Sequence, residues 1–320
     1  MSEEALLDGS STVEKDDKNV KPAKKSVPKM IGLTILFVFL ILFFTLLKLP
    51  QVRITSLLQA YVQVALDPYG IYVTDQGREL SILRGFRYTL DHPTLEFADQ
   101  TRVELDSLVV TPSFLPLLRG KLGVNMTLRQ GASSIVLEGA GRKDLIDAKL
   151  DLDHVDIGKL GVFAYLGSLK GSGEVSGTFQ IAGTLSTPAS LAGLINLKIR
   201  NLKLDEQNLM GFQLPPLVVS EGTVAADIRD GKILIKTVQL GKGSDDLVLS
   251  LKGDVTLNRF LNSSALNLQT SFGLSDRVKQ SLSLLDTLLG NAKTTDGRYA
   301  YKLTGTLGSP YPVPDPNGGK

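Results

Sequence analysis

Residues 122–129, LGVNMTLR, alternate between apolar and polar side chains along their whole length. The apolar positions are Leu122, Val124, Met126 and Leu128. Because successive side chains of a β-strand point to opposite faces of the sheet, this spacing predicts a strand with one apolar and one polar face. The stretch therefore indicates a sheet whose two faces differ in chemical character.

The same period of two recurs on both sides of this stretch. It is present in residues 102–106, 147–153, 175–185, 224–228, 247–251 and 266–272. Asp230 and Gly231 separate two such runs, and an Asp-Gly pair is typical of a tight hairpin turn. Short strands joined by tight turns predict a mainly β fold with few helices, built around one elongated antiparallel sheet.

The apolar face of such a sheet needs a cover, because a monomer rarely leaves a large contiguous apolar surface in water. The sheet either folds on itself into a sandwich or curls into a trough that leaves a groove open to an apolar ligand. The candidate groove residues are Val124, Leu128, Val175, Phe179, Ile181, Leu247, Leu249, Leu251, Leu266 and Leu268.

Short helices are expected beside the strands. The first spans Ile54–Leu66, and the second spans Ile157–Leu166 behind an Asp156 cap. The third follows a Ser275 cap and ends at Leu289.

An internal repeat divides the strand-rich part of the chain. Residues 182–188, AGTLSTP, return as residues 304–310, TGTLGSP, and a predicted helix and strand precede each copy. The repeat suggests two subunits with a loose boundary near 202–214. Residues 311–320 are rich in proline and lack a pattern, so they are expected to form a disordered tail.

A single membrane span is predicted near the N-terminus. The run Met30–Leu47 has 18 residues without a charge or proline, and a helix of this length just crosses the hydrocarbon layer. A cleaved signal peptide would have a shorter leader, a shorter apolar run and a small-residue exit. Residues 30–48 are therefore assigned to a transmembrane helix, with Met30, Leu36, Phe39, Phe43 and Leu47 as anchor residues.

The flanking charges predict the orientation of the span. Lys21, Lys24, Lys25 and Lys29 precede it, whereas Lys48 and Arg53 follow it. Because Lys and Arg accumulate on the cytoplasmic side, residues 1–29 are expected to form a disordered cytoplasmic tail, with residues 49–310 outside the cytoplasm.

Composition excludes several function classes. The chain has no cysteine and only two histidines, so it has no disulfide framework, zinc cluster or thiol nucleophile. Its formal charge of +2 lacks the basic excess of a nucleic-acid binder. His92 and His154 have no triad context, and Asp151, Asp153 and Asp156 lack the glycine and glutamate of a calcium loop. We therefore expect no enzymatic activity, cofactor or metal site.

Several segments resemble a known superfamily. Asp106–Val110 and Leu117–Leu122, which lead into Leu128 and then Ile135–Leu137, are similar to the AsmA-type pattern of strand, glycine-containing turn and strand. Leu169–Leu204 resembles another passage of the same superfamily, with Gly177, Gly183, Pro188 and Gly193 at its glycine and proline positions. With one N-terminal span and the terminal Gly305–Pro310, the chain resembles the bacterial type II secretion system protein N (GspN) family.

This resemblance implies a bacterial inner-membrane protein with a periplasmic β domain and no catalytic residues. Two hypotheses follow. The chain is an assembly or accessory scaffold that contacts other type II secretion components, or it is a lipid-handling protein whose apolar sheet face holds phospholipid acyl chains for outer-membrane maintenance.

Overall fold

The computed structural model describes residues 36–41, 55–56, 59–60, 63–64, 66–81, 86–97, 101–161, 169–209, 212–282 and 289–316. The chain divides into two compact units, residues 1–50 and 51–320. In the first unit residues 36–41 are helical, and the side chains of Leu36 and Phe39 are exposed. The rest of the expected span and tail, with Met30, Phe43 and Leu47, lies outside the described residues. No helix within the described ranges has both the length and the apolar character to cross a membrane.

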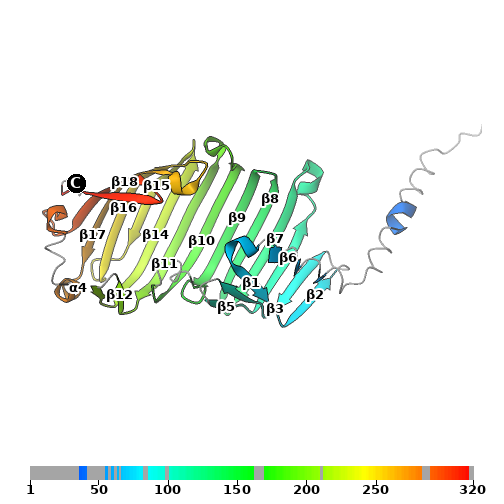
Figure 1. The fold of residues 1–320 in the computed structure, drawn as a ribbon, viewed down its shortest axis with the longest axis horizontal. Helices are drawn as coiled ribbons and strands as arrows, with labels where there is room; N and C mark the ends of the chain where they lie inside the picture. The colour runs from blue at the N-terminus through cyan, green and yellow to red at the C-terminus, as the bar shows by residue number, and fades with distance from the viewer. Residues whose placement is uncertain are drawn as a thin grey trace, which may run out of the picture. The chain divides into compact units, whose positions relative to one another are not determined.

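The second unit is built on a large antiparallel sheet, which confirms the predicted mainly β class (Figure 1). In the described part of the chain the sheet has 14 strands, which follow one another in sequence order. They are β2 (Gly77–Ser81), β3 (Arg87–Asp91), β6 (Ser107–Ser113), β7 (Leu122–Gln130), β8 (Ser133–Arg142), β9 (Leu145–Asp156), β10 (Gly171–Thr184), β11 (Ala192–Leu204), β14 (Leu217–Arg229), β15 (Lys232–Leu240), β16 (Leu247–Thr256), β17 (Ala265–Leu274), β18 (Tyr299–Thr306) and β19 (Ser309–Pro314).

Smaller elements surround this sheet. A second sheet contains β1 (Ile71–Thr74), β4 (Thr94–Phe97) and β5 (Arg102–Glu104), and a hairpin joins β12 (Gln207–Leu209) to β13 (Phe212–Leu214). The short helices are η1 (Asp67–Tyr69), η2 (Pro116–Arg119), η3 (Pro188–Ser190), η4 (Leu261–Ser263), α4 (Asp276–Ser281) and η5 (Gly290–Ala292). The region near 202–214 therefore contains the β12–β13 hairpin, while β11 pairs directly with β14, so one sheet runs through it.

The strand register aligns apolar residues with apolar residues across the whole sheet. One row of directly opposed residues runs from β2 to β19 through Leu80, Tyr88, Val110, Met126, Leu137, Leu150, Phe179, Ile195, Ala226, Ile235, Gly253, Leu268, Leu303 and Pro312. No charged residue interrupts this row. Because a slip of one residue would turn a strand's apolar set to the other face, this continuity is strong evidence for one apolar face.

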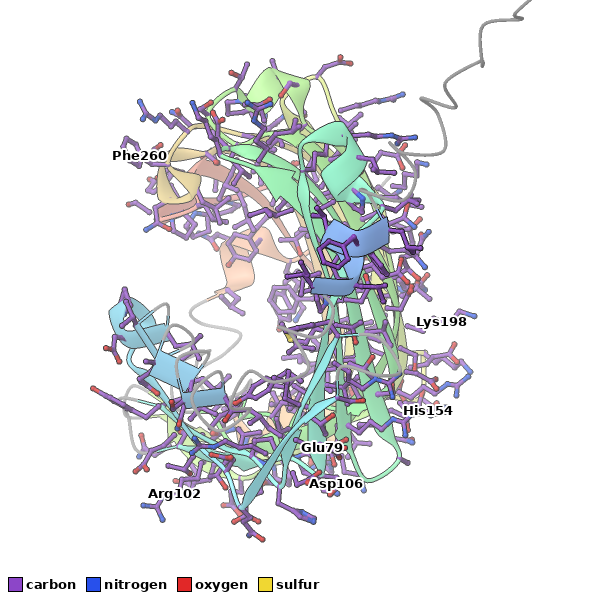
Figure 2. All side chains as sticks on the ribbon, turned by 90° about the vertical axis from the view of Figure 1, so that its right-hand side faces the viewer. Glu79, Arg102, Asp106, His154, Lys198 and Phe260 are labelled. Carbon is purple, nitrogen blue, oxygen red and sulfur yellow. The ribbon has the colours of Figure 1, made fainter. Side chains whose placement is uncertain are left out.

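The large sheet curves along its strands, so that its apolar face is on the inside (Figure 2). Figure 2 shows Lys198 and His154 pointing away from the outer side of the curve. We call the two sides the inner face and the outer face. The sheet therefore forms a curled trough rather than folding on itself into a sandwich.

The trough has a packed cluster of buried residues towards each end. At the first end Leu80, Tyr88 and Leu90 are buried, and Val73 of the small sheet packs against them. At the second end Val255, Leu266 and Leu268 are buried, with Ile233, Ile235, Leu251 and Leu303 packed around them. Between these ends Val155, Val175, Val219, Ala226 and Ile228 are also buried, whereas the described inner-face residues in the middle of β7 to β11 are only partly buried.

Ser275 caps a helix as predicted, whereas Asp156 caps a turn. Oδ1 of Asp156 accepts hydrogen bonds from the amides of Gly158 and Lys159, and Oγ of Ser275 accepts one from the amide of Val278. Residues 157–161 form turns, and most of the expected second helix lies outside the described residues. The third helix, α4, ends at Ser281, and residues 283–288 also lie outside the described residues. The first expected helix is helical at its described positions.

The prediction of a disordered tail from residue 311 is wrong as far as Pro314, because residues 309–314 form the edge strand β19. The amide of Asp315 donates to the carbonyl of Ala300 in β18. Tyr311 and Val313 lie two and four residues before Asp315, so their amides also point towards β18. Pro310, Pro312 and Pro314 occupy the other positions, where the missing amide hydrogen would point away from the sheet. Proline at these positions is compatible with an edge strand.

Candidate binding groove

The candidate site is the middle of the inner face, between the two buried clusters. Its floor is formed by β7, β8, β9, β10, β11 and β14. Met126, Leu137, Leu150, Phe179 and Ile195 lie side by side in the central row, and each is only half-buried. A contiguous aliphatic surface that stays only partly buried on a folded chain is a candidate binding surface.

Two further rows widen this floor. In each row the residues of neighbouring strands are directly opposed. The row on one side contains Leu128, Ile135, Leu152, Gly177, Leu197 and Val224, and the row on the other side contains Val124, Gly139, Ala148, Ile181, Gly193 and Ile228. All of these side chains are apolar or absent. We call the three rows from β7 to β14 the apolar groove.

The register places every groove residue predicted from the sequence on the inner face. Val124, Leu128, Phe179 and Ile181 lie within the apolar groove and are half-buried, whereas Val175 lies next to it and is buried. The others lie on β16 and β17, towards the second end of the trough. Leu247, Leu249 and Leu251 are half-buried there, and Leu266 and Leu268 are buried.

The predicted set omitted several residues of the groove. Leu137 and Ile195 lie in its central row, and Leu197 lies in the next. Each belongs to a strand with the same alternation, so the signal needed to find these residues was present in the sequence.

The inner face carries no charged side chain in the described strands β7 to β17. Its titratable groups include two phenols nearer the ends, Tyr88 and Tyr301. Burial raises the pKa of both, so these phenols are neutral at physiological pH. The electrostatics of the trough interior therefore suit an uncharged, apolar ligand.

The outer face is polar and carries ion pairs. Lys149 and Asp151 lie 2.6 Å apart, and this hydrogen bond raises the pKa of the lysine and lowers the pKa of the carboxyl group. Lys236 pairs with Asp227 at 2.8 Å, and Lys232 pairs with Asp254 at 3.4 Å. Water can solvate these groups directly, so they need no cover.

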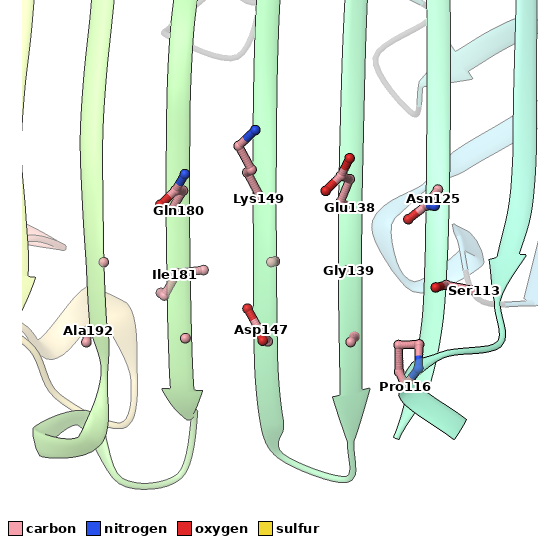
Figure 3. A pocket seen from close by; sticks show the side chains of 14 residues that line it. Ser113, Pro116, Asn125, Glu138, Gly139, Asp147, Lys149, Gln180, Ile181 and Ala192 are labelled. Atoms are coloured by element: carbon pink, nitrogen blue, oxygen red, sulfur yellow. The ribbon is translucent and has the colours of Figure 1, made fainter. Parts of the chain in front are cut away.

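A shallow hollow of about 570 Å³ lies on the outer face (Figure 3). Asn125, Glu138, Lys149 and Gln180 line it and are opposed in one row across β7, β8, β9 and β10. Small residues such as Ala192 leave the space open. The hollow is suited to polar contacts rather than to an apolar ligand.

The residues considered as catalytic or metal candidates have structural partners. Nδ1 of His154 lies 2.7 Å from Oε1 of Glu174, Asp151 pairs with Lys149, and Asp156 caps a turn. No group of three histidine or acidic side chains within the described residues is arranged to hold a metal ion.

Comparison of the chain with protein-family models, with curated proteins and with solved structures finds no match. Membership of the GspN family and of the AsmA-like superfamily therefore stays a prediction from the sequence.

Proposed function

We propose that this chain is a non-enzymatic lipid-handling protein of the bacterial inner membrane, and that its apolar groove holds the acyl chains of phospholipids. The observation that carries the proposal is the uncharged inner face of β7 to β11, whose apolar side chains are only partly buried between two buried clusters. Burial of this surface against acyl chains would be favourable by about 25 cal/mol per Å² of apolar area. The AsmA-type resemblance in Leu169–Leu204 supports the same function.

The dimensions of the groove suit acyl chains. Neighbouring strands lie about 4.8 Å apart, so the five spacings from β7 to β14 span roughly 24 Å. One leaflet of a bilayer has a hydrocarbon depth of about 15 Å. An acyl chain that lies across the strands is therefore shorter than the open part of the trough.

The proposed location follows from the sequence. The predicted span at residues 30–48 would hold the chain in the inner membrane with its N-terminus in the cytoplasm, and the trough would lie in the periplasm. No cofactor or nucleic acid takes part in this function.

A matched pair of variants tests the proposal. Ile195 lies in the central row of the groove, and its neighbour Asn196 is exposed on the outer face. We expect Ile195→Asp to remove most of the phospholipid that copurifies with the full-length chain, because a carboxylate on the groove floor must stay hydrated. Asn196→Asp adds the same charge outside the groove and should leave the lipid unchanged. The measurement is mass spectrometry of extracted lipid, with circular dichroism to verify the fold.

Lipid held around a membrane helix would be the same in both variants, so only the difference between them counts. Equal lipid in well-folded preparations of the two variants would show that the groove does not hold acyl chains.

A second candidate function is an accessory scaffold of type II secretion, as the GspN resemblance implies. The polar hollow on the outer face favours it, because polar side chains around a concavity can recognise a protein partner. Ala182→Arg would place a long side chain on this lining. If the scaffold function holds, this variant should lose a secretion component that copurifies with the wild type, while its lipid content is unchanged.

A further inference from the structure

The turns along the two rims of the trough differ in character. Because the strands form an antiparallel meander, alternate turns lie at the same end of the strands. One rim contains the turns β6–β7, β8–β9, β10–β11, β14–β15, β16–β17 and β18–β19, which lie along the upper edge of the sheet in Figure 1. We call it the apolar rim, and we call the other the polar rim. Figure 2 shows Phe260 at the first and Asp106 at the second.

Large apolar side chains project into solvent from the apolar rim. They include Leu115, Leu118, Leu122, Leu185, Phe260 and Leu307. Leu118 is 86% exposed, Leu115 is 77% exposed and Phe260 is 72% exposed. These side chains come from turns that are far apart in the sequence, so no local feature of one loop explains their exposure.

Cationic side chains accompany these residues on the same rim. Arg119 and Lys121 belong to the β6–β7 turn, Arg142 and Arg229 end β8 and β14, and Arg259 lies beside Phe260. None of these five forms an ion pair with an acidic side chain within the described residues. Asp144 and Asp230 are the acidic residues in the described turns of this rim, so the rim combines exposed apolar groups with an excess of cations.

The polar rim has the opposite organisation. No described turn of this rim exposes a large apolar side chain, and Val218, the second residue of β14, is 43% exposed beside it. Its carboxylates bind the turns together: Asp246 contacts Arg277 at 2.5 Å, and Asp245 accepts hydrogen bonds from the amide and hydroxyl of Ser220. Such contacts stabilise the turns and leave little surface for an apolar partner.

We propose that the apolar rim docks on a lipid bilayer that contains anionic headgroups. Exposed Leu and Phe side chains insert at the boundary between headgroups and acyl chains, and Arg and Lys bind the anionic lipid above them. The apolar residues form a line of separate turn tips from β6 to β18, on the order of 50 Å long at about 4.8 Å per strand. A line of this kind fits a flat bilayer better than a protein partner, whose binding energy concentrates in one central patch.

Docking would also bring the bilayer to the edge of the apolar groove. Leu122 lies on the rim, and its strand continues with Val124, Met126 and Leu128 on the inner face. An acyl chain that leaves the bilayer at this rim meets apolar side chains along the whole path. This part of the inference rests on the proposed lipid function, whereas docking itself does not.

The test uses the full-length chain in zwitterionic nanodiscs, mixed with phosphatidylcholine vesicles that contain or lack phosphatidylglycerol. Flotation then measures binding to the vesicles. We expect the wild type to float with the anionic vesicles and much less with the neutral ones. Charge reversal at Arg119→Glu with Lys121→Glu should weaken flotation roughly tenfold or more. The same reversal on the outer face, Lys198→Glu with Lys203→Glu, should have little effect.

A second pair of variants reports on insertion directly. The chain has no cysteine, so Leu118→Cys and Val218→Cys each give a single site for a polarity-sensitive fluorophore. Val218 is an exposed apolar residue at the polar-rim end of β14 and serves as the matched control. Only the label at position 118 should shift to the blue when anionic vesicles are added.

Equal shifts at both positions, or unchanged flotation of the Arg119→Glu/Lys121→Glu variant, would overturn docking through this rim. Binding to neutral vesicles as strong as to anionic vesicles would overturn the proposed role of the cations. Lipid content of the same preparations separates the two proposals. If the Arg119→Glu/Lys121→Glu variant loses flotation but keeps its copurified lipid, the result supports docking independently of the lipid function. If the wild type floats but carries no lipid in its groove, the result refutes only the lipid function.

Discussion

At the scale of single residues, Asp246 is the clearest junction on the polar rim. Its carboxylate accepts hydrogen bonds from the amide of Val218 at 3.0 Å, from the hydroxyl of Ser275 at 2.8 Å and from Arg277 at 2.5 Å. These partners belong to the start of β14, the N-cap of α4 and the first turn of α4. One side chain therefore ties three segments that are distant in the sequence.

The ionisation of Asp246 makes this junction dependent on pH. Burial acts to raise its pKa, but the hydrogen bonds from Arg277, Ser275 and Val218 outweigh that effect and lower the pKa below the ordinary 3.8. Because the folded pKa is the lower one, the contribution to stability is complete above about pH 4 and is lost as the pH falls through the folded value.

We therefore expect Asp246→Asn to destabilise the protein by about 1–2 kcal/mol at neutral pH, and this difference from the wild type should shrink in acid. Urea unfolding at several pH values measures it. Asp276→Asn is the control, because that carboxylate is 92% exposed and should matter little at any pH. If the stability difference between the wild type and Asp246→Asn stays constant down to low pH, the ionised Asp246 carboxylate is not what stabilises these contacts.

At the scale of elements, the close approach of β10 and β11 depends on Gly177. Its φ of +143° is rare for residues with a side chain, and an added Cβ would lie 2.1 Å from the carbonyl oxygen of Asn196. The residue also lies two positions from Val175, where β9 contains a bulge at Asp153 and His154. Glycine therefore lets the β10 backbone approach β11 this closely, next to the point where the pairing of β10 with β9 shifts register.

Gly177→Ala should therefore cost about 1–3 kcal/mol, through strain and a displaced strand. Gly243 in the β15–β16 turn is the matched control, because nothing lies within 4 Å of its added Cβ and its φ is not positive. Gly243→Ala should change stability by no more than about 0.5 kcal/mol. If chemical denaturation shows similar midpoints for the two variants, the close contact at Gly177 is not a constraint on the fold.

The same elements show what the sequence could predict and what it could not. Alternation is a local signal, so it identified the strands and their two faces. The residue type at a helix start is also local, and it identified Ser275 as the cap of α4, whereas Asp156 caps a turn instead of the predicted helix. The bulge between Leu152 and Val155 interrupts that alternation, and only pairing with β10 reveals it. The strand β19 was missed because of its prolines. Proline fits an edge strand only when its missing amide hydrogen points away from the paired strand, and that depends on the pairing with β18 rather than on the local sequence.

At the scale of the whole sheet, the sequence left the choice between a closed core and an open groove undecided. That choice depends on contacts between segments that are not strand neighbours, such as Val73 of the small sheet against the cluster of Leu80, Tyr88 and Leu90. Such contacts have no periodic signature. The candidate residues were therefore correctly placed on one face, but the sequence could not separate Leu268 in a packed end from Phe179 in the open groove.

This division between closed ends and an open centre predicts how truncations of the same size should differ. Leu268→Ala would leave a cavity inside the buried cluster formed with Val255 and Leu266, and such changes typically cost about 2–5 kcal/mol. Leu150→Ala removes the same atoms from the half-buried groove floor, where solvent can occupy the space. Its cost should be clearly smaller, about 1 kcal/mol in the lipid-free protein, because less apolar area leaves water at that site.

Urea unfolding of the lipid-free, full-length chain measures the stability of the wild type and of both truncations. The measurement is then repeated after phospholipid is added back. Added lipid should stabilise the wild type, since a ligand that binds only the folded state shifts the unfolding equilibrium. It should stabilise Leu150→Ala less, because that variant offers acyl chains a smaller contact area, whereas Leu268→Ala should gain about as much as the wild type. Equal costs for the two truncations in the lipid-free protein would mean that the centre of the trough is packed as tightly as its ends.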